Sequence, residues 1–400
     1  MKINRKIAAT LATSALFMQM MVAATFAMSC SITGNGSSTT NNCDFTISRT
    51  TDVNQDNDMD VDNDVNIDQN SGDNEVEDNL GEVTVNTGDN TADVTLTTEG
   101  NTNAANTQGS SAHNYDLLIK NNLSDSDNDI DLDITEKVDV DQDNDADVDN
   151  DVKIDQSSGK NEVEDNLSGD ADPSVRTGDN DATVKTSTTV NANAAVVGAD
   201  DEAGNFSATI SGNGSETDND IDFDALSDID VDQDNDADVD NDVDVDQDSG
   251  DNEIEDNLGE VSLRTGDNTA DIMADTMSNF NTASVMGGFL FGDVDVTIGS
   301  NIEDSTNSID LDLTDNLDVD QDNDQDVDND LDADQESGDN EVEDNLGDVD
   351  VNDTGDNDTT VSASTSGNAN AFGGDLDIDF DVDLSELMSL LSALANALGL

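Results

Sequence analysis

Strict alternation of aspartate with apolar or amide residues is the feature that most limits how this chain can fold. From Asp228 to Asp248 every second residue is aspartate, and isoleucine, valine, alanine, asparagine or glutamine stands between successive aspartates. A period of two residues is typical of a β-strand, in which neighbouring side chains point to opposite faces. The stretch therefore predicts a strand with a carboxylate face toward solvent and an inward face of apolar and amide side chains.

The net charge sets a second limit. The 400 residues include 97 acidic and 11 basic residues, which give a formal net charge of -86, and aromatic residues make up 3% of the chain. Few aromatic residues and a high net charge are also typical of disordered chains, so largely disordered acidic repeats are the alternative fold prediction. Such a charge disfavours nucleic acid as a partner and favours divalent cations.

The alternating stretch occurs four times, which predicts a stacked repeat architecture. Equivalent glutamines at positions 55, 142, 233 and 321 are 87, 91 and 88 residues apart. The sequence divides into a signal peptide at 1–29, a polar lead-in at 30–50, repeats at 51–137, 138–228, 229–316 and 317–374, and a truncated fifth repeat strand with an amphipathic helix at 375–400.

Shorter motifs inside each repeat predict rungs of 16 to 17 residues. Asparagine followed by alternating apolar residues recurs at Asn235, Asn252 and Asn268. Stacking would place each buried amide over its copy, so that the amides bond in ladders as they do in cross-β stacks. We therefore expect an all-β, repetitive β-solenoid of stacked β-rungs. The predicted ladder residues are Gln55, Gln69, Gln142, Gln156, Gln233, Gln247, Gln321, Gln335, Asn74, Asn161, Asn252 and Asn340.

The N-terminus has the features of a bacterial secretory signal peptide. Lys2, Arg5 and Lys6 precede a mostly apolar run, and small residues near positions 27 and 29 offer cleavage sites. We therefore expect a secreted or cell-surface protein. Cys30 and Cys43, the two cysteines of the chain, predict a disulfide in an oxidising compartment. Lipid attachment at Cys30 is the alternative, and it would anchor the protein to a membrane.

The C-terminus carries a helical pattern. Apolar residues in the segment Ser385–Leu398 recur at helical spacing, and Gly399 follows where a helix would end. Repeat stacks need their last apolar face covered, so the sequence predicts a short capping helix. Docking on a membrane surface and pairing with another subunit are the alternatives.

Aspartate rows are the candidate site. Alternate residues of a strand are ~6.6 Å apart and neighbouring strands ~4.8 Å apart, so stacked carboxylates repel one another and need counter-cations. Calcium is the expected ion, because it is a hard cation that takes six to eight oxygen ligands. The candidate metal ligands are Asp232, Asp234, Asp236, Asp238, Asp242, Asp244, Asp246, Asp248 and Glu253.

A calcium loop of the EF-hand type and a catalytic centre are both disfavoured. The best EF-hand register, from Asp242 to Glu253, has Gln247 where the loop needs glycine. One histidine and two cysteines leave no zinc set and no histidine-dependent triad. We therefore predict a non-enzymatic protein.

Two segments of the third repeat, Gln247–Ile254 and Gly266–Ile272, resemble the curlin repeat, in which glutamine, glycine and Asn-x-Ala stand at short spacings. The resemblance implies stacked β-rungs of secreted adhesive fibres, and more broadly a bacterial surface repeat protein of the β-solenoid kind. It also implies self-association into fibres or matrix. We therefore expect an exported structural or adhesive protein of the cell surface or extracellular matrix, stabilised by calcium. A disordered acidic protein that binds cations at the surface is the alternative.

Overall fold

A computed structural model of the chain describes residues 3–13, 17–20, 27–107, 114–166, 173–198, 204–286, 291–337, 339–351 and 354–373. Over these residues the chain is all-β, and it forms parallel strands joined by short turns. The same ranges contain no helix of the length and apolarity needed to cross a membrane. The all-β prediction is confirmed, and the disordered alternative does not describe these residues.

The largest element is a parallel sheet of four strands, each 31 residues long, which we call the long sheet. Its strands are β4 (Thr40–Asn70), β9 (Asp127–Ser157), β14 (Asp218–Asp248) and β19 (Thr306–Glu336). The four strands pair in register without a shift along their whole length. None of them contains glycine or proline, so the alternation continues over ~100 Å without a turn.

In two further parallel sheets the chain returns along the length of the long sheet. The return sheet contains β7 (Asn90–Asn106), β12 (Asn180–Gly198), β17 (Asn268–Met286) and β22 (Asn357–Phe372), and β1 (Ile3–Thr13) and β2 (Phe17–Met20) pair with β7. The other sheet contains β3 (Ala27–Thr33), β8 (Asn114–Lys120), β13 (Gly204–Ser211) and β18 (Phe291–Gly299). Together these sheets lie against the inward face of the long sheet.

Short strands close the far end of the molecule. One sheet contains β5 (Glu75–Glu77), β10 (Glu162–Glu164), β15 (Glu253–Glu255) and β20 (Glu341–Glu343). The other contains β6 (Thr84–Asn86), β11 (Ser174–Arg176), β16 (Val261–Arg264) and β21 (Val349–Val351). The alternation slips by one residue at Ser249-Gly250, which predicts a turn or a bulge, and the chain turns here, between the end of β14 and the start of β15.

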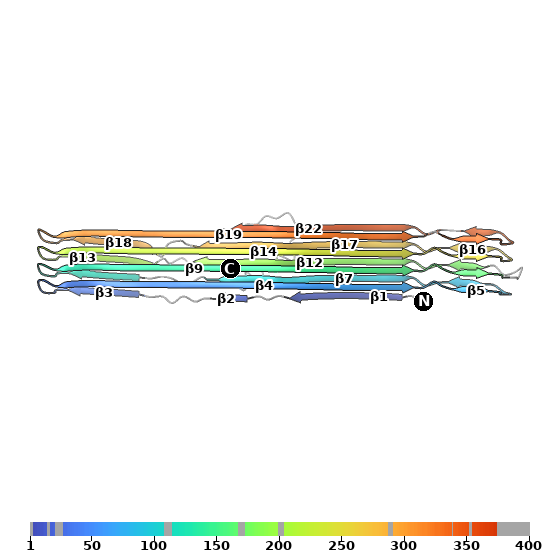
Figure 1. Ribbon diagram of the computed structural model, residues 1–400, viewed down its shortest axis with the longest axis horizontal. Helices are drawn as coiled ribbons and strands as arrows, with labels where there is room; N and C mark the ends of the chain where they lie inside the picture. Colours follow the sequence, from blue (N-terminus) through green and yellow to red (C-terminus); the bar gives the residue numbers. More distant parts are fainter. Residues whose placement is uncertain are drawn as a thin grey trace.

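One rung consists of one strand from each of the five sheets, so the rungs are β3–β7, β8–β12, β13–β17 and β18–β22. Figure 1 shows the four rungs stacked, with each rung far longer than the stack is high. This is the arrangement of a β-solenoid, but the predicted rung of 16 to 17 residues is wrong. Stacked residues come from successive repeats, as Gln55 and Gln142 do, and not from successive short motifs.

The core is a thin layer between the long sheet and the sheets that face it. Along β14 every odd-numbered position from Asn219 to Gln247 is buried, and the even-numbered positions point outward. Two fully buried aromatic side chains, Phe206 and Phe223, stack with ring centroids 4.0 Å apart. Elsewhere isoleucine, leucine, valine, alanine and amide side chains fill the layer. Every second residue of a strand contributes to it, because side chains alternate between the two faces.

Three predictions from the sequence concern the repeat boundaries, the disulfide and the C-terminal segment. The repeat boundaries at 138, 229 and 317 fall inside β9, β14 and β19, so each rung begins earlier, at β8, β13 and β18. Cys30 of β3 and Cys43 of β4 form a disulfide with a Cα–Cα distance of 6.2 Å. The predicted strand after residue 375 and the capping helix Ser385–Leu398 lie outside the described residues.

Candidate cation-binding face

The outward side chains of the long sheet form a flat acidic surface, which we call the aspartate face. The eight aspartates predicted on β14 all occupy its outward, even-numbered positions, and the register of the sheet brings six of them beside aspartates of both β9 and β19. Asp244 lies between Lys153 and Asp332, and Asp248 lies between Ser157 and Glu336. The backbone explains this arrangement. Unbroken alternation turns every aspartate outward, and pairing without a shift places like residues in one row.

Many rows are aspartate in all four strands. Asp58, Asp145, Asp236 and Asp324 form one such row across β4, β9, β14 and β19. Complete rows also contain the β4 positions Asp52, Asp56, Asp60, Asp62, Asp64 and Asp68. Neighbouring carboxylates are thus ~4.8 Å apart across the strands and ~6.6 Å apart along them. This lattice of oxygen ligands could hold several hard cations.

Burial and like charge act together on these carboxyl groups. Partial burial and then the neighbouring aspartates raise the pKa of Asp232, Asp234, Asp236 and Asp242 above the ordinary range. For Asp236 the neighbours that contribute are the aspartates on both sides of its row and along its own strand. A cation placed among these groups would oppose the same repulsion and favour their ionised form.

Two lysines already place positive charge within the aspartate face. Lys153 of β9 occupies an outward position and donates a hydrogen bond of 2.9 Å to Oδ2 of Asp244 on β14. Its Nζ also lies 3.8 Å from Oδ2 of Asp246. Lys137 pairs in the same way with Asp228, at 2.7 Å. In both rows the lysine ammonium on β9 contacts a carboxylate on β14, in the next rung.

Glu253 does not join the other predicted ligands. It lies on β15, in a separate sheet, where its carboxylate groups with those of Glu164 and Glu255 within 4.8 Å. A hydrogen bond to Glu162, burial and the surrounding glutamates raise the pKa of Glu164 to about 7. The structure therefore does not bring Glu253 together with the aspartates of β14, as an EF-hand-like loop would require.

Sequence reasoning missed most of this glutamate cluster. The strands β5, β10, β15 and β20 all read Glu-apolar-Glu, and stacking produces the groups Glu77–Glu162–Glu164, Glu164–Glu253–Glu255 and Glu255–Glu341–Glu343. The repeated triplet was a detectable signal. It was overlooked because a strand of three residues carries almost no periodicity of its own.

The predicted amide ladders are assembled between rungs. Nε2 of Gln142 donates to Oε1 of Gln55 at 2.7 Å, and Nε2 of Gln233 donates to Oε1 of Gln142 at 2.7 Å. The other predicted links are Gln321 to Gln233, Gln156 to Gln69, Gln247 to Gln156, Gln335 to Gln247, Asn74 to Asn161, Asn161 to Asn252 and Asn252 to Asn340. The amides of these ladders bond to their copies in the neighbouring rungs, and the ladders fix the register of the aspartate face above them.

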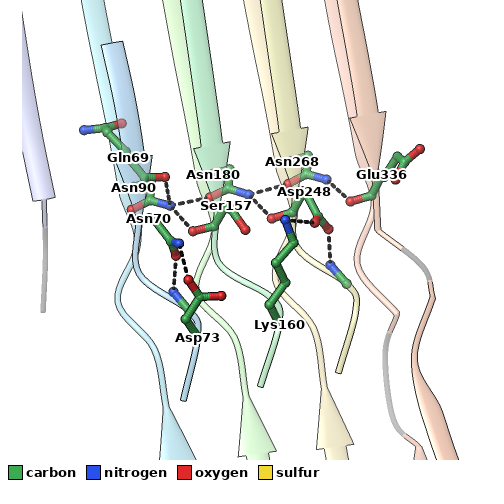
Figure 2. A network of polar contacts seen from close by, with 12 residues as sticks. Gln69, Asn70, Asp73, Asn90, Ser157, Lys160, Asn180, Asp248, Asn268 and Glu336 are labelled. Atoms are coloured by element: carbon green, nitrogen blue, oxygen red, sulfur yellow. Dashed lines mark hydrogen bonds and ion pairs between the residues drawn. The ribbon is translucent and has the colours of Figure 1, made fainter. Parts of the chain in front are cut away.

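A further ladder stabilises the corner where the long sheet ends. Figure 2 shows Asn90, Asn180 and Asn268 in line, with Asn90 donating to Asn180, Asn180 to Asn268, and each of the three to a backbone carbonyl at the end of a long strand. Asn268 also donates to Asn357 of the last rung. Asn180, for example, donates to Asn268 at 2.9 Å and to the carbonyl of Asp248 at 3.0 Å. These asparagines end the Thr-Gly-Asp-Asn motif of each repeat. They hold the return strand against the aspartate strand.

The fold and the aspartate face together define the chain as an all-β stack of parallel sheets in the β-solenoid arrangement, with one acidic face. Comparisons of this chain with protein-family models, with curated proteins and with solved structures find no match. The curlin resemblance therefore stays a prediction. What the arrangement can do chemically follows from its oxygen lattice, which suits the binding of hard cations.

Proposed function

We propose that this protein is an exported, non-enzymatic structural or adhesive protein of the bacterial cell surface or extracellular matrix, and that its aspartate face binds calcium. The observation that carries the proposal is the set of complete aspartate rows across four rungs. A solvating acidic surface needs charge but no register. Here the same row positions hold aspartate in every rung, and the amide ladders keep them aligned.

The electrostatic repulsion within the cation-free aspartate face supports a role for cations. Each pair of neighbouring carboxylates costs ~0.9 kcal/mol across strands and ~0.6 kcal/mol along them, even in a water-like dielectric. An interior aspartate such as Asp236 has two neighbours of each kind. Summed over the face, the repulsion reaches the size of a typical folding free energy of about 5–15 kcal/mol. Divalent cations between the rows would remove most of it.

Lys153 supports the same proposal, because it shows that a positive group fits between the rungs. Its ammonium bridges to two carboxylates of the next strand, as a bound ion would. Export is supported by the N-terminal sequence and is compatible with the disulfide between Cys30 and Cys43. Calcium is abundant outside cells and accepts irregular sets of oxygen ligands, which favours it over magnesium.

Thermal unfolding with and without calcium tests the proposal. We expect millimolar calcium to raise the melting temperature above that in chelator, as followed by the β signal in circular dichroism. Replacing one interior carboxylate by Asp236→Asn should weaken calcium binding in calorimetry and stabilise the calcium-free protein by about 1 kcal/mol after screening.

The matched control is Asp275→Asn on β17. Asp275 is exposed, but its neighbours across the return sheet are Ser187 and Ser364, so it belongs to no carboxylate row. Its replacement should change neither calcium binding nor calcium-free stability. Identical melting in calcium and chelator, or equal effects of the two substitutions, would refute the proposal.

A further inference from the structure

The last rung leaves core positions of the solenoid open. Ile309, Leu311 and Leu313 of β19 are 47%, 44% and 43% exposed. Their equivalents in the third rung include Ile221 and Phe223, which are fully buried. The difference arises because β14 has a strand on both sides, whereas among the described strands β19 has a neighbour on one side. An open parallel edge with half-exposed core side chains is a surface that accepts another strand.

We propose that copies of this chain stack head to tail, so that β18, β19 and β22 of one copy pair in parallel with β3, β4 and β7 of the next. The inference rests on the proposed function, because stacking extends the aspartate rows, which bound cations would favour, and because export would remove the strands that cover the first rung. The chain itself indicates what fits this edge. Each rung already pairs with the next through the same sheets and in the same register.

The two ends of the stack match residue by residue. In the internal register, Gln321 of one copy would lie against Gln55 of the next, and Val327 against Val61. The pairs Val319 with Val53, Asn323 with Asn57, Asn329 with Asn63 and Gln335 with Gln69 also join like residues. Amide ladders and most apolar rows would thus continue across the junction, and in one row Gln325 would meet Met59.

Asn90 provides independent evidence that the first rung can accept a further rung of the same kind. Its side chain is fully buried, and its Oδ1 accepts no hydrogen bond. In the ladder of Figure 2 the Oδ1 of Asn180 accepts from Asn90, and that of Asn268 accepts from Asn180. Asn357, at the other end of the stack, donates from Nδ2 to the carbonyl of Gln335. In a stacked pair of copies that Nδ2 would also reach Oδ1 of Asn90.

Residues 3–13 and 17–20 occupy the place of the preceding rung on the return sheet. β1 pairs with β7 in the register that a β22 strand would take, and it places Ile3 beside Asn90, where the other rungs place asparagine. β2 pairs with the end of the same strand. Stacking therefore requires that these two strands leave. Their position inside the predicted signal peptide means that export would uncover the edge.

A second copy fits the open β19 edge better than the C-terminal segment does. A helix over Ser385–Leu398 would be ~21 Å long, whereas β19 spans ~100 Å. The segment could cover part of the edge, but another rung would cover all of it. The test below distinguishes these two occupants.

Paired cysteines on the aspartate face test the register. Asp58→Cys combined with Asp324→Cys would bring two thiols together only between copies, because β9 and β14 separate β4 from β19 within one copy. Across the proposed junction their Cα atoms would be ~4.8 Å apart, which a disulfide can span. The matched control combines Asp58→Cys with Asp326→Cys. It removes the same charge, but its Cα atoms would be ~8 Å apart, beyond the reach of a disulfide.

The assay uses the exported chain without the predicted signal peptide 1–29, which retains all four rungs apart from the first three residues of β3. After mild oxidation in calcium, we expect the first pair to give a ladder of covalent oligomers, at least tenfold more than the control. Monomers in both variants, or equal ladders, would overturn the proposal; monomers would indicate that residues 374–400 cover the edge. If the cysteine variants fold poorly, sedimentation of the unaltered exported chain decides: polymers support stacking and monomers overturn it.

The unprocessed chain tests the role of residues 3–13 and 17–20. With the same cysteine pair the unprocessed chain should stay monomeric. Covalent oligomers of equal length would show that β1 does not block stacking at the edge of β7. Stacking and the proposed function can fail separately. A calcium-dependent melting temperature without oligomers would refute stacking alone, whereas oligomers with no effect of calcium on melting would refute cation binding alone.

Discussion

Replacing Gly159 by alanine is expected to destabilise the stack, because the rungs touch at this position backbone to backbone. A Cβ on Gly159 would overlap the carbonyl oxygen of Gly250 in the next rung and lie 2.6 Å from its carbonyl carbon. Ordinary Cβ contacts are longer than 3.0 Å, so the two turns would have to separate. That movement would strain the backbone bonds that link them.

The size of the effect follows from these contacts. Two hydrogen bonds join the turns here, from the amide of Ser158 to the carbonyl of Asp248 at 2.8 Å and from the amide of Lys160 to the carbonyl of Gly250 at 3.2 Å. Losing both costs about 2 kcal/mol, and the overpacked turn costs about 1–3 kcal/mol more. We therefore expect a loss of about 3–5 kcal/mol in the free energy of unfolding.

Urea unfolding in saturating calcium, followed by circular dichroism, measures this loss. The matched control is Gly36→Ala, because a Cβ on Gly36 meets no atom within 4 Å. Both substitutions stiffen the unfolded chain equally, so that effect cancels in the comparison. A difference below about 1 kcal/mol between the two variants would refute the close stacking of the turns at Gly159 and Gly250.

Two other predictions concern the ladders and the pH. Gln142→Leu should cost about 3 kcal/mol in urea unfolding, because it removes the donor to Gln55, the acceptor for Gln233 and the donor to the carbonyl of Ala194. The control Gln335→Leu, at the half-buried end of a ladder in the unstacked chain, should cost about 1 kcal/mol, and equal losses would count against the ladder. In chelator, melting temperature should fall as the pH rises from about 4 to 8. The raised pKa values of the aspartates, and that of Glu164 at about 7, mean that the folded state binds more protons than the unfolded state. Calcium at pH 8 should reverse the fall, and a melting temperature that instead increases with pH would contradict the assignment.

Much of the aspartate face could be predicted from the sequence. Alternation from Asp228 to Asp248 determines which side chains share a face, and this holds for any extended strand. The recurrence of Gln142 and Gln233 at equal places in each repeat predicts the ladders. The slip at Ser249-Gly250 predicts the turn. These inferences succeeded because each depends on local geometry or on identity between repeats.

The number of residues in one rung could not be predicted from the sequence in the same way. The motif that begins at Asn235 resembles those at Asn252 and Asn268, so the sequence offers a short period beside the long one. Pairing energy decides between them. A partner one repeat away, as Asn144 is for Asn235, matches along a whole 31-residue strand, whereas a partner 17 residues away would match over a few positions. Glu253 was misplaced for a related reason, since its sheet forms from short strands of different repeats.

By itself, then, the sequence determined that this protein would be a β-structure with one acidic and one buried face and with its repeats in register. These properties follow from a two-residue period and from near-identical copies. Only the tertiary structure decided that a whole repeat makes one rung, that the glutamates of β10 and β15 cluster, and that β1 lies on the edge of β7. Those outcomes depend on which distant strands pair, and long-range pairing is settled by the summed contacts of the complete stack.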